Sequence, residues 1–217
     1  LADGASLGTH ESQSRMWENL VGRSRPFWRF FMPHLQTTFP EQFRNVDAEK
    51  MYRAVNSVQP SLIRVEADEV TYNLHIMLRF ELENALLEGR LAVSDLPDAW
   101  NARMQEYLGI TPPDDAHGVL QDVHWSHGSF GYFPTYSLGN FFAAQLFDQI
   151  RKDISGLDTY FEKGEFHILL DWLRTHLHTH GRKFTLDELA NKITGESLQT
   201  HSFTAYLKNK YGEIYNL

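Results

Sequence analysis

Apolar residues recur at helical spacing along most of this chain, and several of these stretches open with residues that cap helices. Ser24 and Pro26 stand just before a run of aromatic residues, which is typical of a helix start, and Pro33 is expected to end or kink that helix. Thr185 and Glu188 form the signature of a capping box. Further helices are expected between Asp47 and Pro60, between Ser94 and Gly109, from Gly139 to Ile154, and from Ser202 onward.

The segment from Val70 to Leu82 is the one place where the pattern favours a strand, because its apolar residues alternate without a break. Its length is more than twice the roughly 5–6 residues of a typical strand, and it contains neither Gly nor Pro. Helix-favouring residues continue directly after it, and Met77 adds an apolar side chain on the opposite parity. We therefore predict a helix that is buried on several sides.

The chain shows no internal repeat, no low-complexity segment and no flexible linker. Residues 1–217 are accordingly predicted to form a single helical region, and the fold class is predicted to be mainly α.

Composition narrows the classes of function. A net charge of −8 argues against nucleic-acid binding, which requires a basic surface. The absence of cysteine excludes a disulfide framework and a thiol nucleophile, and it fits a cytoplasmic location. No apolar run approaches the length that crosses a membrane, so a membrane is not expected as a partner. Because of the net charge, a nucleic acid is not expected as a partner either.

Two short polar stretches could carry chemistry. The first runs from His10 to Arg15, where a helix would place Glu11 and Arg15 on one face. Taken alone, this pattern is more simply explained by a solvated, charged helix surface. The second runs from Ile63 to Asp68. The rigid fork of Arg64 suits a carboxylate ligand, and the simpler alternative is a structural ion pair with Glu66 or Asp68.

The third stretch, from Gly118 to Tyr136, concentrates histidine, tyrosine and glycine and is expected to be a loop. Imidazole and phenol donors on such a loop could stabilise an oxyanion, or the loop could simply be tightly packed. His176 and His180 stand four residues apart, as helical metal ligands do, but their place in a last helical turn also suits the helix dipole.

Taken together, these three stretches resemble the signature blocks of the thermostable, Taq-like M32 metallocarboxypeptidases. The matching segments are His-Glu-Ser-Gln at His10–Gln13, Ile-Arg-Val-Glu-Ala-Asp at Ile63–Asp68, and Gly-Val-Leu-Gln-Asp-Val-His-Trp at Gly118–Trp125. They occur in the family's order, and the likeness extends to the end of the chain. The resemblance implies the C-terminal half of a helical, neurolysin-like metallopeptidase cleft fold, and a peptide substrate from which C-terminal amino acids are released with broad specificity.

The resemblance also implies roles for individual residues. Glu11 matches the third ligand of a zinc site, with cobalt as an alternative metal, whose two histidines come from a His-Glu-x-x-His helix. Arg64 matches the arginine that helps to bind the substrate's α-carboxylate. Gln121 is the second candidate for substrate binding. His124 and Tyr136 are the candidates for stabilising the oxyanion at the scissile carbonyl, with Tyr132 in reserve. Gln121 and Asp122 are expected to orient the loop or His124.

One departure from the family is serious, because no His-Glu-x-x-His motif occurs in these 217 residues. The first residue is also not methionine. The sequence therefore predicts a fragment that is metal-free and inactive alone, that exposes apolar surface, and that needs a missing N-terminal part as its partner. A homodimer is expected for the intact enzyme. The alternative is a non-catalytic helical module that binds peptide C-termini or mediates dimerisation.

Overall fold

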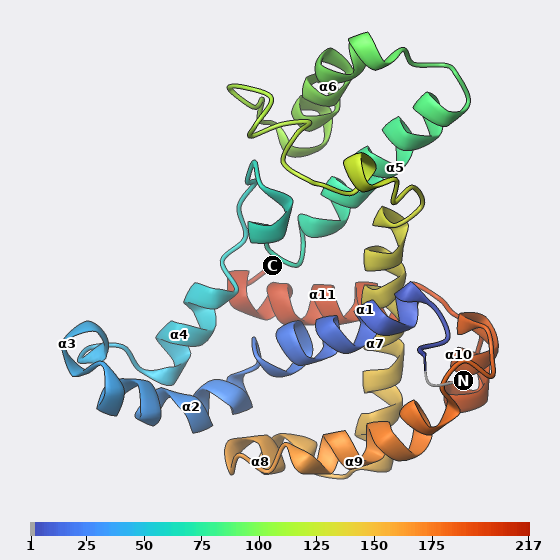
Figure 1. Ribbon diagram of the computed structural model, residues 1–217. Coiled ribbons are helices and arrows are strands. Elements are labelled where there is room, and N and C mark those ends of the chain that lie inside the picture. The colour runs from blue at the N-terminus through green and yellow to red at the C-terminus, as the bar shows by residue number, and fades with distance from the viewer. Residues whose placement is uncertain (1–2) are drawn as a thin grey trace. The chain divides into compact units, whose positions relative to one another are not determined.

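The computed structural model describes residues 3–217, and all regular structure in this range is helical (Figure 1). The mainly α fold class is thereby confirmed. The α-helices have the following bounds: α1 Leu7–Arg15, α2 Arg25–Thr38, α3 Pro40–Phe43, α4 Ala48–Val55, α5 Tyr72–Leu87, α6 Leu96–Leu108, α7 Phe133–Asp153, α8 Leu157–Glu162, α9 His167–His176, α10 Leu186–Thr194 and α11 His201–Tyr215. Within this range, no helix is both long and apolar enough to cross a membrane.

The chain divides into two compact units. The first comprises Leu1–Asn56 and Leu138–Leu217, and the second comprises Ser57–Ser137. In the first unit, α2 packs against α4 and α8. Its core gathers apolar side chains from the turn after α1 and from α7 to α10, among them Met16, Phe142, Leu146, Ile150, Phe161, Leu169 and Leu189.

The second unit is built around α5 and α6, which pack side by side (Figure 1). Leu78 and Leu82 of α5 meet Trp100 and Met104 of α6 in one apolar cluster. Tyr72 and Ile76 of α5 belong to a second cluster, with Ala67 and Phe133. The helix predicted across Val70–Leu82 is therefore confirmed. Its lack of helical periodicity follows from its burial on more than one face.

Caps set most of the helix bounds as predicted. The Ser24 hydroxyl accepts from the Phe27 backbone N–H at the start of α2, and the Asp47 carboxylate accepts from the Lys50 N–H at the start of α4. Thr185 and Glu188 form both bonds of the capping box. Gly109 and Gly195 end α6 and α10 in the left-handed conformation that favours glycine.

One predicted helix start is wrong, and one predicted helix does not end where a proline allowed it to end. The helix α2 continues through Pro33 to Thr38, and Pro33 lies on its exposed side, where water can compensate the lost backbone bond. The helix α7 begins at Phe133 rather than Gly139, so that Tyr136 is helical and not part of a loop. Pro134 is compatible with this start, because the first helical turn needs no backbone N–H from it.

Gly139 allows an unusually close approach of α7 to α1 within the first unit. A Cβ atom on Gly139 would lie 2.8 Å from the Cβ atom and 2.9 Å from the carbonyl carbon of Glu11. Both contacts are shorter than real carbon–carbon contacts, and one of them involves backbone. Glycine at this position therefore fixes the distance between the two helices.

We expect Gly139→Ala to lower the stability of the first unit by about 1–3 kcal/mol, because the added methyl group overpacks the contact with α1. This would reverse the gain of about 1 kcal/mol that alanine normally gives inside a helix. Gly212→Ala in α11 is the matched control, since its added methyl group meets open space. Urea unfolding followed by circular dichroism would measure both. A stabilised Gly139→Ala variant would contradict the close approach.

Candidate active site

The second unit brings together the motif residues that lie between Ile63 and Tyr136. Arg64 begins a single 3₁₀ turn, Arg64–Glu66, just before α5. Asp68 holds the chain between this turn and the helix, because its carboxylate accepts from the backbone N–H groups of Val70 and Thr71 at 2.9 Å each. The Asp68 carboxylate is therefore hydrogen-bonded to the backbone. The simple alternative of an Arg64 ion pair with Glu66 or Asp68 is wrong.

The partner of Arg64 is Asp122 of the third motif. Arg64 Nη2 lies 2.5 Å from Asp122 Oδ1, and Arg64 Nε donates to the same oxygen at 3.1 Å. Arg64 Nη1 donates to the Tyr72 hydroxyl at 2.7 Å, and the Arg64 backbone N–H donates to the Gln121 side-chain oxygen at 2.8 Å. Arg64 is only 4% exposed. Its guanidinium is thus held on all three nitrogens.

A second arginine shares the same carboxylate. Arg79 of α5 is fully buried, and its Nε donates to Asp122 Oδ2 at 2.7 Å. Arg79 Nη1 donates to the His75 carbonyl oxygen at 2.9 Å, and the guanidinium carbon lies 4.5 Å from the centre of a Trp100 ring. Sequence reasoning missed Arg79. The signal was present as a cation inside the apolar run Val70–Leu82.

The pKa values of this cluster follow from burial and from its charges. Burial raises the pKa of Asp122, but the hydrogen bond from Arg64 and the charge of Arg79 outweigh it and bring the pKa below its usual value. Burial lowers the pKa of Arg64, yet the bond to Asp122 raises it overall. Burial lowers the pKa of Arg79 to about 10. At neutral pH, two buried cations therefore share one carboxylate.

His124 and Tyr136, the candidates for oxyanion stabilisation, lie next to this cluster. His124 Nε2 is 3.1 Å from the Tyr136 hydroxyl oxygen, and His124 Nδ1 is 3.7 Å from Asp122 Oδ1. The guanidinium carbon of Arg64 lies 4.8 Å from the centre of the Tyr136 ring. The structure thus connects the arginine, the carboxylate, the imidazole and the phenol in one continuous array.

Tyr132 and Gln121 complete the set of predicted residues in this unit. The Tyr132 ring centre lies 5.2 Å from that of His124 and 5.3 Å from that of Tyr136. Gln121 Nε2 donates to the carbonyl oxygens of Leu62 and His117 at 3.0 Å each. Both ends of the Gln121 amide are therefore bound to backbone.

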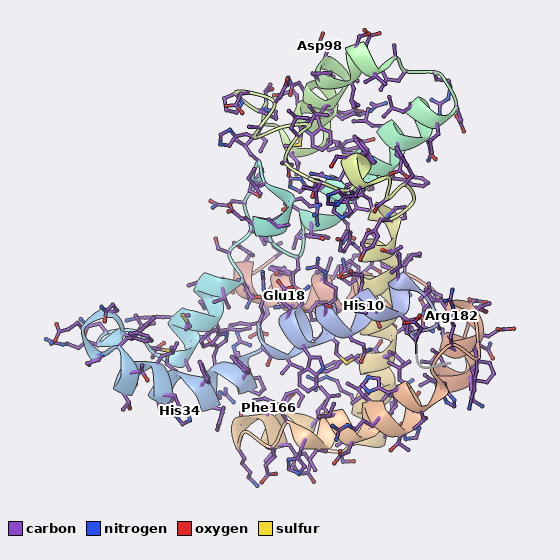
Figure 2. All side chains as sticks on the ribbon, viewed as in Figure 1. His10, Glu18, His34, Asp98, Phe166 and Arg182 are labelled. Atoms are coloured by element: carbon purple, nitrogen blue, oxygen red, sulfur yellow. The ribbon has the colours of Figure 1, made fainter. Side chains whose placement is uncertain are left out.

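Glu11, the predicted metal ligand, belongs to the first unit. It lies on α1, is 8% exposed, and backs onto Gly139 of α7. Its neighbour His10 is exposed (Figure 2). A π-helical turn, Met16–Val21, follows α1 directly, and such turns are frequent at functional sites.

The described residues do not by themselves form a metal site. Between residues 3 and 217, no group of three or more His, Asp or Glu side chains is arranged to hold a metal ion. The clustered histidines have other contacts: the His176 ring centre lies 4.6 Å from that of Trp172, and His178 Nε2 lies 2.9 Å from the Gln13 side-chain oxygen. A single carboxylate, Glu11, falls short of the three protein ligands that a catalytic zinc ion requires.

Comparison with known proteins gives one consistent result. The profile of the Carboxypeptidase Taq (M32) metallopeptidase family matches residues 1–211. The chain is 51% identical over 98% of its length to thermostable carboxypeptidase 1 of Thermus thermophilus, and 46% identical over its whole length to carboxypeptidase 1 of Bacillus subtilis. It also superimposes on the M32 carboxypeptidase from Deinococcus radiodurans with a TM-score of 0.95 and 49% identity, covering 99% of this chain and 44% of the other.

The chain therefore belongs to the carboxypeptidase Taq (M32) metallopeptidase family, as the three motifs indicated. It spans 42% of the length of the Thermus protein and 43% of that of the Bacillus protein.

We expect Asp122→Asn to lower the free energy of unfolding by about 3–5 kcal/mol, because it leaves two buried guanidinium groups without a counter-charge. Asp98→Asn on α6 (Figure 2) is the control in the same unit. The exposed Asp98 interacts mainly with the helix dipole, so its loss should cost less than about 1 kcal/mol. Urea unfolding at pH 7 would compare them. Equal stability of the two variants would contradict the shared carboxylate.

His75 should make the stability of the second unit depend on pH. Burial, followed by the charges of Arg79 and Arg64, lowers its pKa from 6.5 to about 3. The unfolded chain then binds more protons between these values, so stability falls as pH drops through this window, by at most about 1.4 kcal/mol per pH unit. His75→Leu should weaken this decline when unfolding is measured between pH 7 and pH 4. Parallel curves for the two proteins would refute it.

Proposed function

We propose that this chain supplies part of the active site of a metal-dependent carboxypeptidase that releases C-terminal amino acids from peptides with broad specificity. Family membership supports the class of reaction. The observation that carries the proposal is the contact between His124 Nε2 and the Tyr136 hydroxyl beside the Arg64–Asp122 pair. With the imidazole Nε2–H donating to the phenol oxygen, the Tyr136 O–H stays available to donate to a developing oxyanion.

Glu11 is proposed as one metal ligand, with two histidines supplied from outside these 217 residues. The ion, zinc or alternatively cobalt, would act as a Lewis acid when bound. Because the described residues offer one candidate ligand and no cluster, we derive no step of the reaction through the metal. We propose accordingly that the chain alone does not hydrolyse peptides. Burial of Glu11 against Gly139 supports a fixed ligand position, because the carboxylate stem cannot move toward α7.

Arg64 is proposed to bind the α-carboxylate of the substrate, with Gln121 fixing its backbone. Arg64 in the structure is committed to Asp122 and Tyr72. Substrate binding through Arg64 therefore requires the carboxylate of the peptide to exchange with Asp122 or to share the guanidinium with it. Arg79 also binds Asp122, so this exchange would not leave the Asp122 carboxylate without a counter-charge.

His124 and Tyr136 are proposed to stabilise the carbonyl oxygen of the scissile bond as negative charge develops there, with Tyr132 as the alternative. Both units are proposed to belong to one catalytic domain. A homodimer and a cytoplasmic location remain predictions from the family resemblance.

Reconstitution tests this proposal directly. The chain would be combined with a polypeptide that carries the His-Glu-x-x-His helix of a relative, and metal-dependent release of C-terminal amino acids would be measured. We expect Tyr136→Phe to reduce kcat by about 10²–10³-fold, which is the usual effect of removing one oxyanion donor. Tyr107→Phe is the matched control. The Tyr107 hydroxyl donates to the Glu81 carboxylate at 2.7 Å and takes no part in the proposed site.

Glu11→Gln should abolish both activity and bound metal in the same preparation, while Glu18→Gln should retain both. Absence of hydrolysis with two well-folded partners would contradict the proposal. Binding of peptides with free C-termini but without hydrolysis would favour the non-catalytic module instead.

A further inference from the structure

In the segment between His124 and Tyr132, Trp125 packs against the two apolar clusters of this unit, while the residues that follow it are mostly exposed. It contains one 3₁₀ turn, Trp125–His127, followed by two glycines with positive φ, Gly128 at 71° and Gly131 at 77°. Phe130 between these glycines is 48% exposed. A loop of this kind needs an external contact to hold one conformation, and His124 stands at its start.

Glu83 of α5 provides that contact. Its Oε2 accepts from Trp125 Nε1 at 2.7 Å, and its Oε1 accepts from the Gly131 backbone N–H at 2.6 Å. The side chain is only 3% exposed. One buried carboxyl group therefore bridges the beginning and the end of the loop, and each of its oxygens has a donor.

The second anchor of this region lies one helical turn earlier on α5. Arg79 and Glu83 stand four residues apart and so share a face of the helix. Arg79 holds Asp122, which precedes His124, and Glu83 holds Trp125 and Gly131, which follow it. The polypeptide is thereby fixed on both sides of the imidazole.

Burial of apolar surface does not account for the buried position of Glu83. An acidic side chain inside a helix core is costly unless its oxygens are bonded. Here the donors come from the loop and not from the neighbouring helix α6. The groups that compensate the burial of Glu83 are thus the groups whose position it determines.

We propose that Glu83 is a positioning residue, which locks residues 125–131 and thereby orients His124 and its contact with Tyr136. Its consequence for catalysis rests on the proposed function. Its consequence for the loop does not, because the contacts lie wholly within this chain.

The variant Glu83→Gln tests the proposal with little change in shape. An amide can accept at one position but presents N–H at the other, so one of the two loop donors loses its partner. We expect the backbone amides of residues 125–131 to exchange with deuterium about tenfold faster, as for the loss of one buried hydrogen bond. Amides of α6 should keep their exchange rates. Nitrogen chemical shifts of the His124 imidazole should change with the loop.

Glu88→Gln is the matched control at the end of the same helix, where the carboxylate is 61% exposed and pairs only with Arg90 among the described ion pairs. It should alter neither the loop exchange nor the His124 shifts. Trp125→Phe is a milder second variant, which removes the indole donor and leaves the carboxyl group. If Glu83 acts through Trp125, the effects of Glu83→Gln and Trp125→Phe on loop exchange should be less than additive.

Unchanged loop exchange in Glu83→Gln, or an equal acceleration of the α6 amides, would overturn the proposal. In the reconstituted enzyme, Glu83→Gln should lower kcat about tenfold and leave KM nearly unchanged, because only the orientation of donors at the oxyanion is lost. An unchanged kcat would overturn the positioning role. If the unmodified chain gives no activity with any complementing polypeptide, the proposed function fails, while loop exchange and the His124 shifts still decide the role of Glu83.

Discussion

The geometry of the second unit depends on the sharing of Asp122 by two buried guanidinium groups. A carboxylate that is nearly removed from water must be paired, and a pair of cations so close together must have a counter-charge between them. Arg64 and Arg79 meet this condition on the two oxygens of Asp122. The three residues come from three separate stretches of the chain. The two ion pairs of Asp122 therefore fix the 3₁₀ turn at Arg64, the helix α5 and the loop that carries Asp122 relative to each other.

The helix α5 transmits this constraint to the candidate site. It is buried toward α6 through Leu78 and Leu82, and it is buried toward the loop through the polar pair Arg79 and Glu83. A helix with apolar contacts on one side and bonded ionisable groups on another has no single hydrophobic face. The same feature that obscures the helical period in the sequence is therefore what gives the loop its anchors.

Sequence reasoning succeeded where the determining interaction is local. The caps at Ser24, Asp47 and Thr185 set helix starts by bonds within a few residues, so they could be predicted from spacing alone. It failed at Phe133, because the start of α7 depends on packing of Phe133 against Tyr72 and Ile76, which are far away in the sequence.

The candidate site shows the same division. Sequence reasoning could find the motif residues Arg64, Gln121 and His124 because they stand in recognisable blocks. In the structure, these blocks lie close together in the second unit. Arg79 and Glu83 belong to no block. Only the positions of their partners reveal their importance, although a charged residue within an apolar run was a usable signal.

If Arg64 binds the substrate carboxylate as proposed, the second arginine acquires a further role. A guanidinium that is already paired can accept a peptide carboxylate only if its own carboxylate partner remains compensated. With Arg64 alone, that exchange would leave Asp122 buried and unpaired, which is the costly state of a buried ion pair. Arg79 removes this difficulty, because it stays on the other oxygen of Asp122 while Arg64 changes partner. Two cations around one carboxylate thus carry an excess of one positive charge, which is compatible with the proposed binding of a peptide C-terminus at Arg64.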